Sequence, residues 1–140
     1  MATAIFFDHI GLSVRPESLE ATIDWYATNL GFAVEQRFQV GESSFAFIIR
    51  NGLRIELVGA ASSASAEVPA DIGSSHTHER LHHLCLAVEN LDATLEALGE
   101  RGIQPITGPF DVPAIGQRLA FVTDNLDNII ELTEPGGSRS

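Results

Sequence analysis

Lysine is absent from this chain of 140 residues, and all eight basic residues are arginine. Without lysine, the chain has neither a Schiff-base amine nor the lysine of a phosphate-binding loop, which excludes aldolase-like, pyridoxal-phosphate and Walker-type chemistry. Basic residues are also few, because 8 arginines stand against 19 acidic residues and give a net charge of −11. So acidic a chain is unsuited to neutralising phosphates, and we expect no nucleic-acid partner.

Cysteine and long apolar runs are scarce as well. The single cysteine, Cys85, excludes an intrachain disulfide and a multi-cysteine zinc site, and we expect it to be a small buried residue. No apolar run approaches the roughly 20 residues of a membrane span, and the first residues lack the basic start of an export signal. We therefore expect a cytoplasmic protein with no membrane partner.

The chain contains an internal repeat. His83 lies 74 residues after His9, and Glu131 lies 75 residues after Glu56. The neighbouring residues match as well: 8–14 (DHIGLSV) recurs as 82–88 (HHLCLAV), and 53–58 (LRIELV) recurs as 128–133 (NIIELT). Two copies of one unit are predicted, each beginning with a histidine strand and ending with a glutamate strand.

Hydrophobic periodicity predicts the order βαβββ for each unit, and hence an α+β fold class. Module 1, roughly residues 4–60, has expected strands over 5–14, 32–38, 45–50 and 53–59 and a helix over 17–30. Module 2, roughly residues 81–135, has expected strands over 81–88, 104–107, 118–123 and 128–133 and a helix between Asn90 and Gly102. Residues 61–80 lack periodicity and are predicted to be a linker within a single domain, 1–140.

Strand alternation assigns the repeated glutamates to particular sheet faces. Glu56 alternates with Ile55 and Leu57, and Glu131 alternates with aliphatic neighbours in the same way. If the aliphatic faces pack on the helices, the opposite faces carry His9, Glu56, His83 and Glu131. Two imidazoles and two carboxylates suit a divalent metal ion such as Ni, Co, Mn, Zn or Fe. We therefore expect the modules to pair into a curved mixed sheet that forms a metal-containing cavity.

The remaining histidines are not predicted to be metal ligands. His82 neighbours His83 but is predicted to point to the opposite face, so we expect a surface or packing role. His76 and His78 fall in the predicted linker and are expected to be solvated.

Five residues are candidates for substrate binding. Arg54 is predicted to share a strand face with Glu56, and Arg118 is a second cation available to a carboxylate or phosphate. Phe45, Phe47 and Phe121 are candidates for the wall of an apolar pocket. The alternative is that the arginines are solvated and the aromatic rings belong to the core.

These segments together resemble the vicinal oxygen chelate superfamily, which includes glyoxalase I, methylmalonyl-CoA epimerase, fosfomycin resistance proteins, bleomycin-binding proteins and extradiol dioxygenases. The resemblance covers nearly the whole chain and rests on 8–14, 25–32 (WYATNLGF), 53–57, 82–88 and 129–132. It implies that the four metal ligands are His9, Glu56, His83 and Glu131, a set most similar to that of glyoxalase I.

The resemblance also implies an activity. It points to a metal-dependent lyase, isomerase or epimerase that acts on a small substrate with vicinal oxygens through a metal-stabilised enolate. Glu131 is the first candidate for the catalytic base and Glu56 the second. Two alternatives stay open: an Fe(II)-dependent ring-cleaving dioxygenase, for which three protein ligands would suit better, and a metal-free binding protein of the bleomycin-resistance type. A homodimer is the family expectation, with the site inside one chain or across two.

Overall fold

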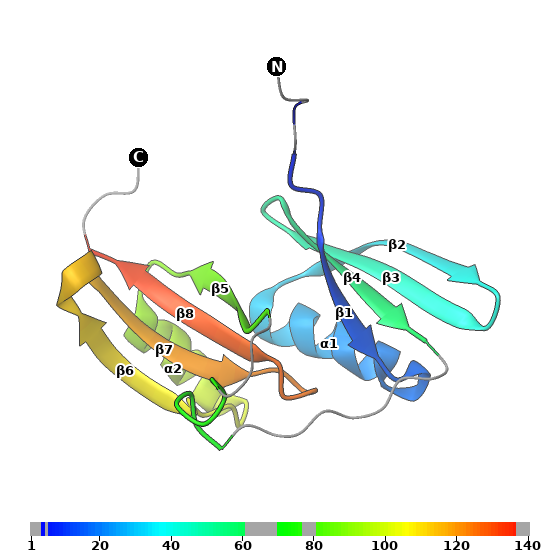
Figure 1. The fold of residues 1–140 in the computed structure, drawn as a ribbon. Helices are drawn as coiled ribbons and strands as arrows, with labels where there is room; N and C mark the ends of the chain where they lie inside the picture. Colours follow the sequence, from blue (N-terminus) through cyan, green and yellow to red (C-terminus); the bar gives the residue numbers. More distant parts are fainter. Residues whose placement is uncertain (1–3, 5, 61–69, 77–80, 137–140) are drawn as a thin grey trace. The chain divides into compact units, whose positions relative to one another are not determined.

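The computed structural model describes residues 4, 6–60, 70–76 and 81–136. The chain divides into two compact units, Met1–Ser65 (unit 1) and Ala66–Ser140 (unit 2). Figure 1 shows the helices and strands of both units. No helix among the described residues is long and apolar enough to span a membrane.

Unit 1 consists of a four-stranded sheet and one α-helix. Its elements are β1 (Ile10–Val14), a 3₁₀ turn η1 (Pro16–Ser18), α1 (Leu19–Leu30), β2 (Ala33–Val40), β3 (Ser43–Arg50) and β4 (Leu53–Gly59). The strand order is β1-β4-β3-β2, with β1 parallel to β4 and the other neighbours antiparallel.

Unit 2 repeats this arrangement. Its elements are β5 (His83–Ala87), α2 (Leu91–Glu100), β6 (Thr107–Val112), a 3₁₀ turn η2 (Pro113–Ile115), β7 (Gln117–Thr123) and β8 (Ile129–Pro135). The strand order is β5-β8-β7-β6, again with one parallel pair followed by two antiparallel pairs. The predicted α+β class with two repeated modules is therefore confirmed.

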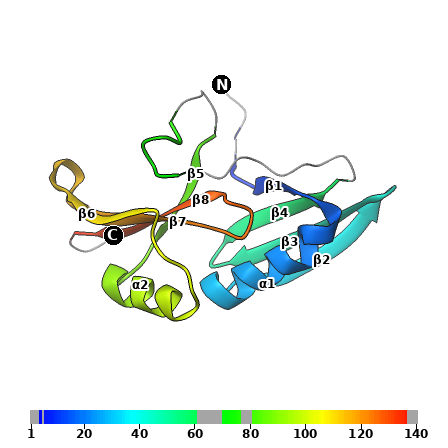
Figure 2. The same cartoon turned by 90° about the horizontal axis from the view of Figure 1, so that it is seen from below.

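Each helix packs on the aliphatic face of its own sheet, as strand alternation predicts (Figure 2). In unit 1 the core includes Ile55 and Leu57 of β4 together with Tyr26 of α1, all almost fully buried. In unit 2 the equivalent residues of β8 are Ile130 and Leu132, and they are equally buried. Burial of each such side chain contributes about 1.5–3 kcal/mol to stability. Glu56 and Glu131 lie on the opposite faces of the two sheets, which we call the glutamate faces.

The two central hairpins differ by one residue. In unit 1, Asn51 and Gly52 have positive φ angles of 47° and 80° and form a two-residue turn between β3 and β4. In unit 2, the backbone N–H of Asp124 donates to Asn128, which leaves three loop residues, and Asp127 has the left-handed φ of 64°. The additional residue explains why the repeat distance changes from 74 to 75 between the histidines and the glutamates.

Part of the predicted linker is packed against unit 2. The backbone N–H of Ile72 donates to the Thr107 hydroxyl, and the Ile72 side chain packs on the apolar cluster of Leu119, Phe121 and Ile129. These three residues belong to the glutamate face of unit 2, because Leu119 and Phe121 pair in register with Thr133 and Glu131. Residues 70–76 are thus part of the surroundings of Glu131, whereas 61–69 and 77–80 lie outside the described residues.

Candidate functional site

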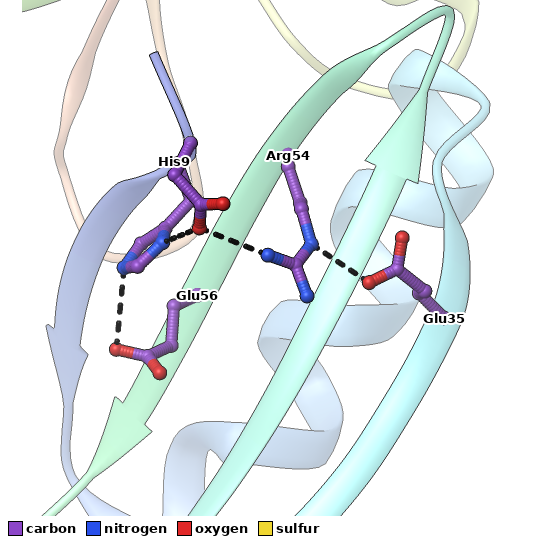
Figure 3. Close-up of polar contacts among 5 residues, drawn as sticks. His9, Glu35, Arg54 and Glu56 are labelled. Carbon is purple, nitrogen blue, oxygen red and sulfur yellow. Dashed lines mark hydrogen bonds and ion pairs between the residues drawn. The ribbon is translucent and has the colours of Figure 1, made fainter. Parts of the chain in front are cut away.

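Unit 1 brings His9 and Glu56 together on neighbouring strands (Figure 3). His9 directly precedes β1, and Glu56 pairs in register with Gly11 at the middle of β4. The distance between His9 Nε2 and Glu56 Oε1 is 3.7 Å, and the side chains are 33% and 20% exposed. The pair is therefore accessible but held close to the sheet.

Asp8 orients the imidazole of His9. Asp8 Oδ2 lies 2.6 Å from His9 Nδ1, and the edge of the ring packs against Phe47, with centroids 5.3 Å apart and planes at 81°. The hydrogen bond from His9, followed by the attraction of Arg54, holds the pKa of the Asp8 carboxyl below its ordinary value. An ionised carboxylate only accepts, so His9 carries its proton on Nδ1, and in the neutral ring the Nε2 lone pair faces Glu56.

Arg54 has two acidic partners beside this pair. Its Nε donates to Glu35 at 2.7 Å and its Nη1 donates to Asp8 at 2.9 Å, as Figure 3 shows for the labelled Arg54 and Glu35. Its guanidinium also lies 3.9 Å above the centre of the Phe47 ring. The hydrogen bond to Glu35 raises the pKa of Arg54 further, so the charge is permanent and already paired. Arg54 is therefore linked to His9 through Asp8, and its guanidinium is already paired with two carboxylates.

Unit 2 brings His83 and Glu131 together in the same way. His83 Nε2 lies 2.8 Å from Glu131 Oε2, and the Glu131 side chain is only 14% exposed. The His83 ring meets Phe121 edge-on, with centroids 5.9 Å apart and planes at 86°. Because Phe121 pairs with Glu131 as Phe47 pairs with Glu56, each unit contains the same triple of histidine, phenylalanine and glutamate.

The support of His83 differs from that of His9. His83 Nδ1 lies 2.9 Å from His82 Nδ1, and His82 Nε2 lies 2.7 Å from the Ser75 hydroxyl. The prediction that His82 points away from His83 was wrong. Strand β5 begins at His83, so the alternation of a strand does not extend to residue 82.

The other predicted residues fall on both faces of the sheets. Phe45 and Phe47 lie on the glutamate face of unit 1, where they pair with Val58 and Glu56. They are joined there by Phe38, whose ring stacks on Phe45 at 4.7 Å with planes only 4° apart. Phe38 was not among the predicted pocket residues, although it lies in the expected strand 32–38 and pairs with Phe45 on the next strand.

Arg118 does not join the His83–Glu131 pair. It pairs with Glu134, which is three positions after Glu131 on β8, and it donates to Asp92 of α2 at 2.7 Å. This places Arg118 on the helix face of the sheet, opposite Glu131.

The prediction of a buried Cys85 was wrong, because the residue is exposed. His76 is exposed as expected, and its ring stacks on His82, while His78 lies outside the described residues.

Each unit supplies two potential metal donors. Within the described parts of the chain, no group of three or more His, Cys, Asp or Glu residues lies close enough together to hold a metal ion. A single His–Glu pair is too small a donor set for the ions considered above, which take at least four ligands. Neither pair alone is therefore a complete set of metal ligands.

The chain thus consists of two tandem βαβββ modules, each of which presents a His–Glu pair on one sheet face. The chain belongs to the glyoxalase/bleomycin resistance protein/dioxygenase superfamily, whose family model matches residues 8–121. The resemblance to the vicinal oxygen chelate superfamily is thereby confirmed.

Individual relatives cover nearly the whole chain. The uncharacterized protein YqjC of Bacillus subtilis is 27% identical over an alignment of 136 residues, which covers 94% of this chain and 94% of that protein. The structure of TnmS3, an antibiotic-binding protein from Streptomyces sp. CB03234, is 23% identical, with a TM-score of 0.66 and coverage of 95% of this chain and 100% of that chain. The trypanothione-dependent glyoxalase I of Leishmania major is 18% identical, with a TM-score of 0.66 and coverage of 92% and 87%.

Proposed function

We propose that this protein is a divalent-metal-dependent lyase, isomerase or epimerase that acts on a small substrate with neighbouring oxygen atoms. The observation that carries the proposal is the arrangement found in both units, where a histidine Nε2 faces a glutamate oxygen at 3.7 Å in unit 1 and 2.8 Å in unit 2. Family membership supports it, because the superfamily includes enzymes of the glyoxalase type.

The donor set fits a divalent ion of the Ni, Co, Mn, Zn or Fe kind. In neutral rings with the proton on Nδ1, the Nε2 lone pair and the carboxylate oxygen are both acceptors, and only a proton or a cation satisfies both. Two neutral imidazoles and two carboxylates also balance a charge of +2. We propose His9, Glu56, His83 and Glu131 as the ligands, supplied by one chain or by two chains of a homodimer.

A bound ion would supply Lewis-acid polarisation of the substrate oxygens. We propose that Glu131 removes the substrate proton and that Glu56 is the second candidate for this role. Glu131 is the less exposed of the two and lies beside Phe121, which limits the access of water to the carboxylate. Phe45, Phe47 and Phe121 would form apolar walls, while Arg54 would position His9 through Asp8.

The second candidate function is metal-free binding of a planar apolar molecule. The observation that favours it is the group of Phe38, Phe45 and Phe47 on one sheet face, in which both pairs formed with Phe38 are stacked. Flat apolar rings stack on such a surface in offset geometry. The similarity to an antibiotic-binding protein supports the same alternative.

Metal analysis of the purified protein separates these functions. We expect about one ion per chain after loading with Zn²⁺ or Ni²⁺ and dialysis, and loss of that ion in both His9→Ala and His83→Ala. Asp24→Ala serves as the control, since Asp24 is an exposed residue of α1, which packs on the other face of the sheet. Absence of binding in the wild type would leave the metal-free binding protein, whereas preferential retention of Fe(II) with oxygen uptake on a catechol would establish the dioxygenase.

A further inference from the structure

Strands β3 and β7 hold the same place in the two sheets but differ in how much of them is exposed. On the helix face, the inner residues of both strands are buried. On the glutamate face, Leu119 and Phe121 of β7 are only 5% and 9% exposed, whereas Phe45 and Phe47 of β3 are half-buried. The two units therefore differ in the accessibility of one sheet face.

In unit 2 this face is partly covered by a residue of the chain itself. The side chain of Ile72 packs on Leu119, Phe121 and Ile129. The backbone N–H of Ile72 donates to the hydroxyl of Thr107, which holds residues 70–76 against the sheet. The apolar surface beside Glu131 is thus already in contact with an aliphatic side chain.

In unit 1 the corresponding face carries three phenylalanine rings, which we call the aromatic cluster: Phe38, Phe45 and Phe47. The ring of Phe38 stacks on Phe45, with centroids 4.7 Å apart and planes at 4°, and on Phe47, with centroids 5.9 Å apart and planes at 25°. All three side chains are half-buried, so part of each ring is accessible. Aromatic rings attract one another through their quadrupoles, in addition to the gain from buried area. The cluster therefore favours a flat aromatic ring over a saturated group of the same size.

The aromatic cluster adjoins the His9–Glu56 pair. Phe47 pairs in register with Glu56, and its ring centroid lies 5.3 Å from that of His9. Phe45 is the diagonal neighbour of Glu56 on the adjacent strand, a separation of about 7–8 Å. A ring bound to the cluster could therefore bring oxygen atoms attached to it, or close to it, to the His9–Glu56 pair.

The charged groups beside the cluster favour an uncharged ring. The guanidinium of Arg54 lies 3.9 Å above the centre of Phe47, but it already donates to Glu35 and Asp8. An anionic substituent on the ring would have to displace one of these carboxylates. Glu56 adds a further acidic group on the same face.

We propose that the substrate carries an uncharged, flat aromatic ring next to its neighbouring oxygen atoms, and that this ring binds the aromatic cluster of unit 1. Phe38 selects for the aromatic ring, because it stacks on both other members of the cluster. Ile72 restricts this binding place to unit 1 by covering the corresponding face of unit 2. The role of the oxygen atoms rests on the proposed function, whereas binding of the ring needs no metal ion.

Fluorescence titration with 2,3-dihydroxynaphthalene tests the proposal in the full-length protein, both metal-free and loaded with Zn²⁺. This probe is flat and uncharged and carries two neighbouring hydroxyls. We expect one probe per chain, and Phe38→Leu should weaken binding about 2- to 10-fold in both forms of the protein. Phe38→Tyr keeps the ring and should retain the affinity of the wild type.

Phe110→Leu is the matched control in unit 2. Phe110 pairs in register with Leu119 as Phe38 pairs with Phe45, so the same substitution is made at the equivalent position. It should leave the affinity unchanged. Equal weakening by Phe110→Leu and Phe38→Leu, or two equal binding sites per chain, would contradict the assignment to unit 1.

Competition in the metal-free protein tests the chemical class of the ligand. Catechol should displace the probe at a lower concentration than cis-cyclohexane-1,2-diol, which has the same size but no aromatic ring. The 6-sulfonate of the probe should bind more weakly than the uncharged probe. Equal displacement by the two diols, or tighter binding of the sulfonate, would overturn the proposed class.

The two forms of the protein separate this inference from the proposed function. A wild type that binds the probe in neither form, or an unchanged affinity in Phe38→Leu, would overturn the inference. Binding that depends on Phe38 but is not strengthened by Zn²⁺ would instead contradict the metal-dependent function and leave the aromatic cluster as a binding place. Binding strengthened by Zn²⁺ but independent of Phe38 would do the reverse.

Discussion

The two units build the same pair of donors on the same scaffold but orient them by different chemistry. In both, the histidine precedes or opens a strand that runs parallel to the glutamate strand, and a phenylalanine lies edge-on to the imidazole. In unit 1 the histidine is held by an ionised carboxylate, which is itself paired with Arg54. In unit 2 it is held by a second imidazole and a serine hydroxyl.

The glutamate faces differ in the same sense. The position of Arg54 in unit 1 corresponds in the repeat to Ile129 in unit 2, which is buried in the apolar cluster covered by Ile72. Unit 1 therefore surrounds its pair with charges, and unit 2 surrounds its pair with apolar side chains. A carboxylate partner raises the basicity of an imidazole ligand, whereas a neutral partner fixes only its orientation. The two copies of the repeat therefore keep the same donors but position them with different neighbouring residues.

The largest effect should come from the cores, in which the units are alike. Leu57→Ala and Leu132→Ala each remove an equivalent, fully buried side chain, so each should reduce the free energy of unfolding by about 2–5 kcal/mol. Urea denaturation of both variants measures this. The exposed Val40→Ala is the control and should change stability by no more than about 0.5 kcal/mol. A large inequality between the two core variants would show that the difference between the units extends beyond the support of the histidines.

Much of this equivalence could be predicted from the sequence. The repeat is visible because DHIGLSV recurs as HHLCLAV and LRIELV recurs as NIIELT. Period-two alternation then predicts that the glutamates lie on the faces opposite Ile55 and Ile130. Alternation also predicts that Arg118 and Phe121 lie on opposite faces, since their positions on one strand differ by three. The same alternation shows that Arg118 and Phe121 could not both lie beside Glu131.

The residues that contact His83 could not be predicted from the sequence, for a physical reason. Ser75 lies in a stretch without periodicity, and its approach to His82 depends on packing of Ile72 against residues more than 40 positions away in the sequence. His82 lies just before a strand, where no alternation rule applies. Contacts of this kind are set by three-dimensional packing and leave no local pattern in the sequence.

An intermediate effect is expected when the charged support of unit 1 is made neutral. Asp8→Asn keeps the shape of the side chain but removes its charge, and loss of such a partner should weaken Zn²⁺ binding about 10- to 100-fold. Competition titration with a chelator measures the change. Asp24→Asn is the charge-matched control, because Asp24 is an exposed residue of α1, which packs on the other face of the sheet. Equal weakening by both variants would mean that net charge, and not the contact to His9, sets the affinity.

The smallest effect should appear in the pH dependence of stability. The hydrogen bond from His9, with a further contribution from Arg54, lowers the pKa of Asp8 in the folded protein below its value in the unfolded chain. The unfolded chain therefore binds the proton more tightly, and Asp8 stabilises the fold above its unfolded pKa of about 3.9. This contribution is lost as the pH falls through the lower, folded value. Urea midpoints of wild type and Asp8→Asn should accordingly differ at neutral pH and converge as the pH falls through the lowered pKa of Asp8. A difference that grows on acidification would contradict the charged support assigned to unit 1.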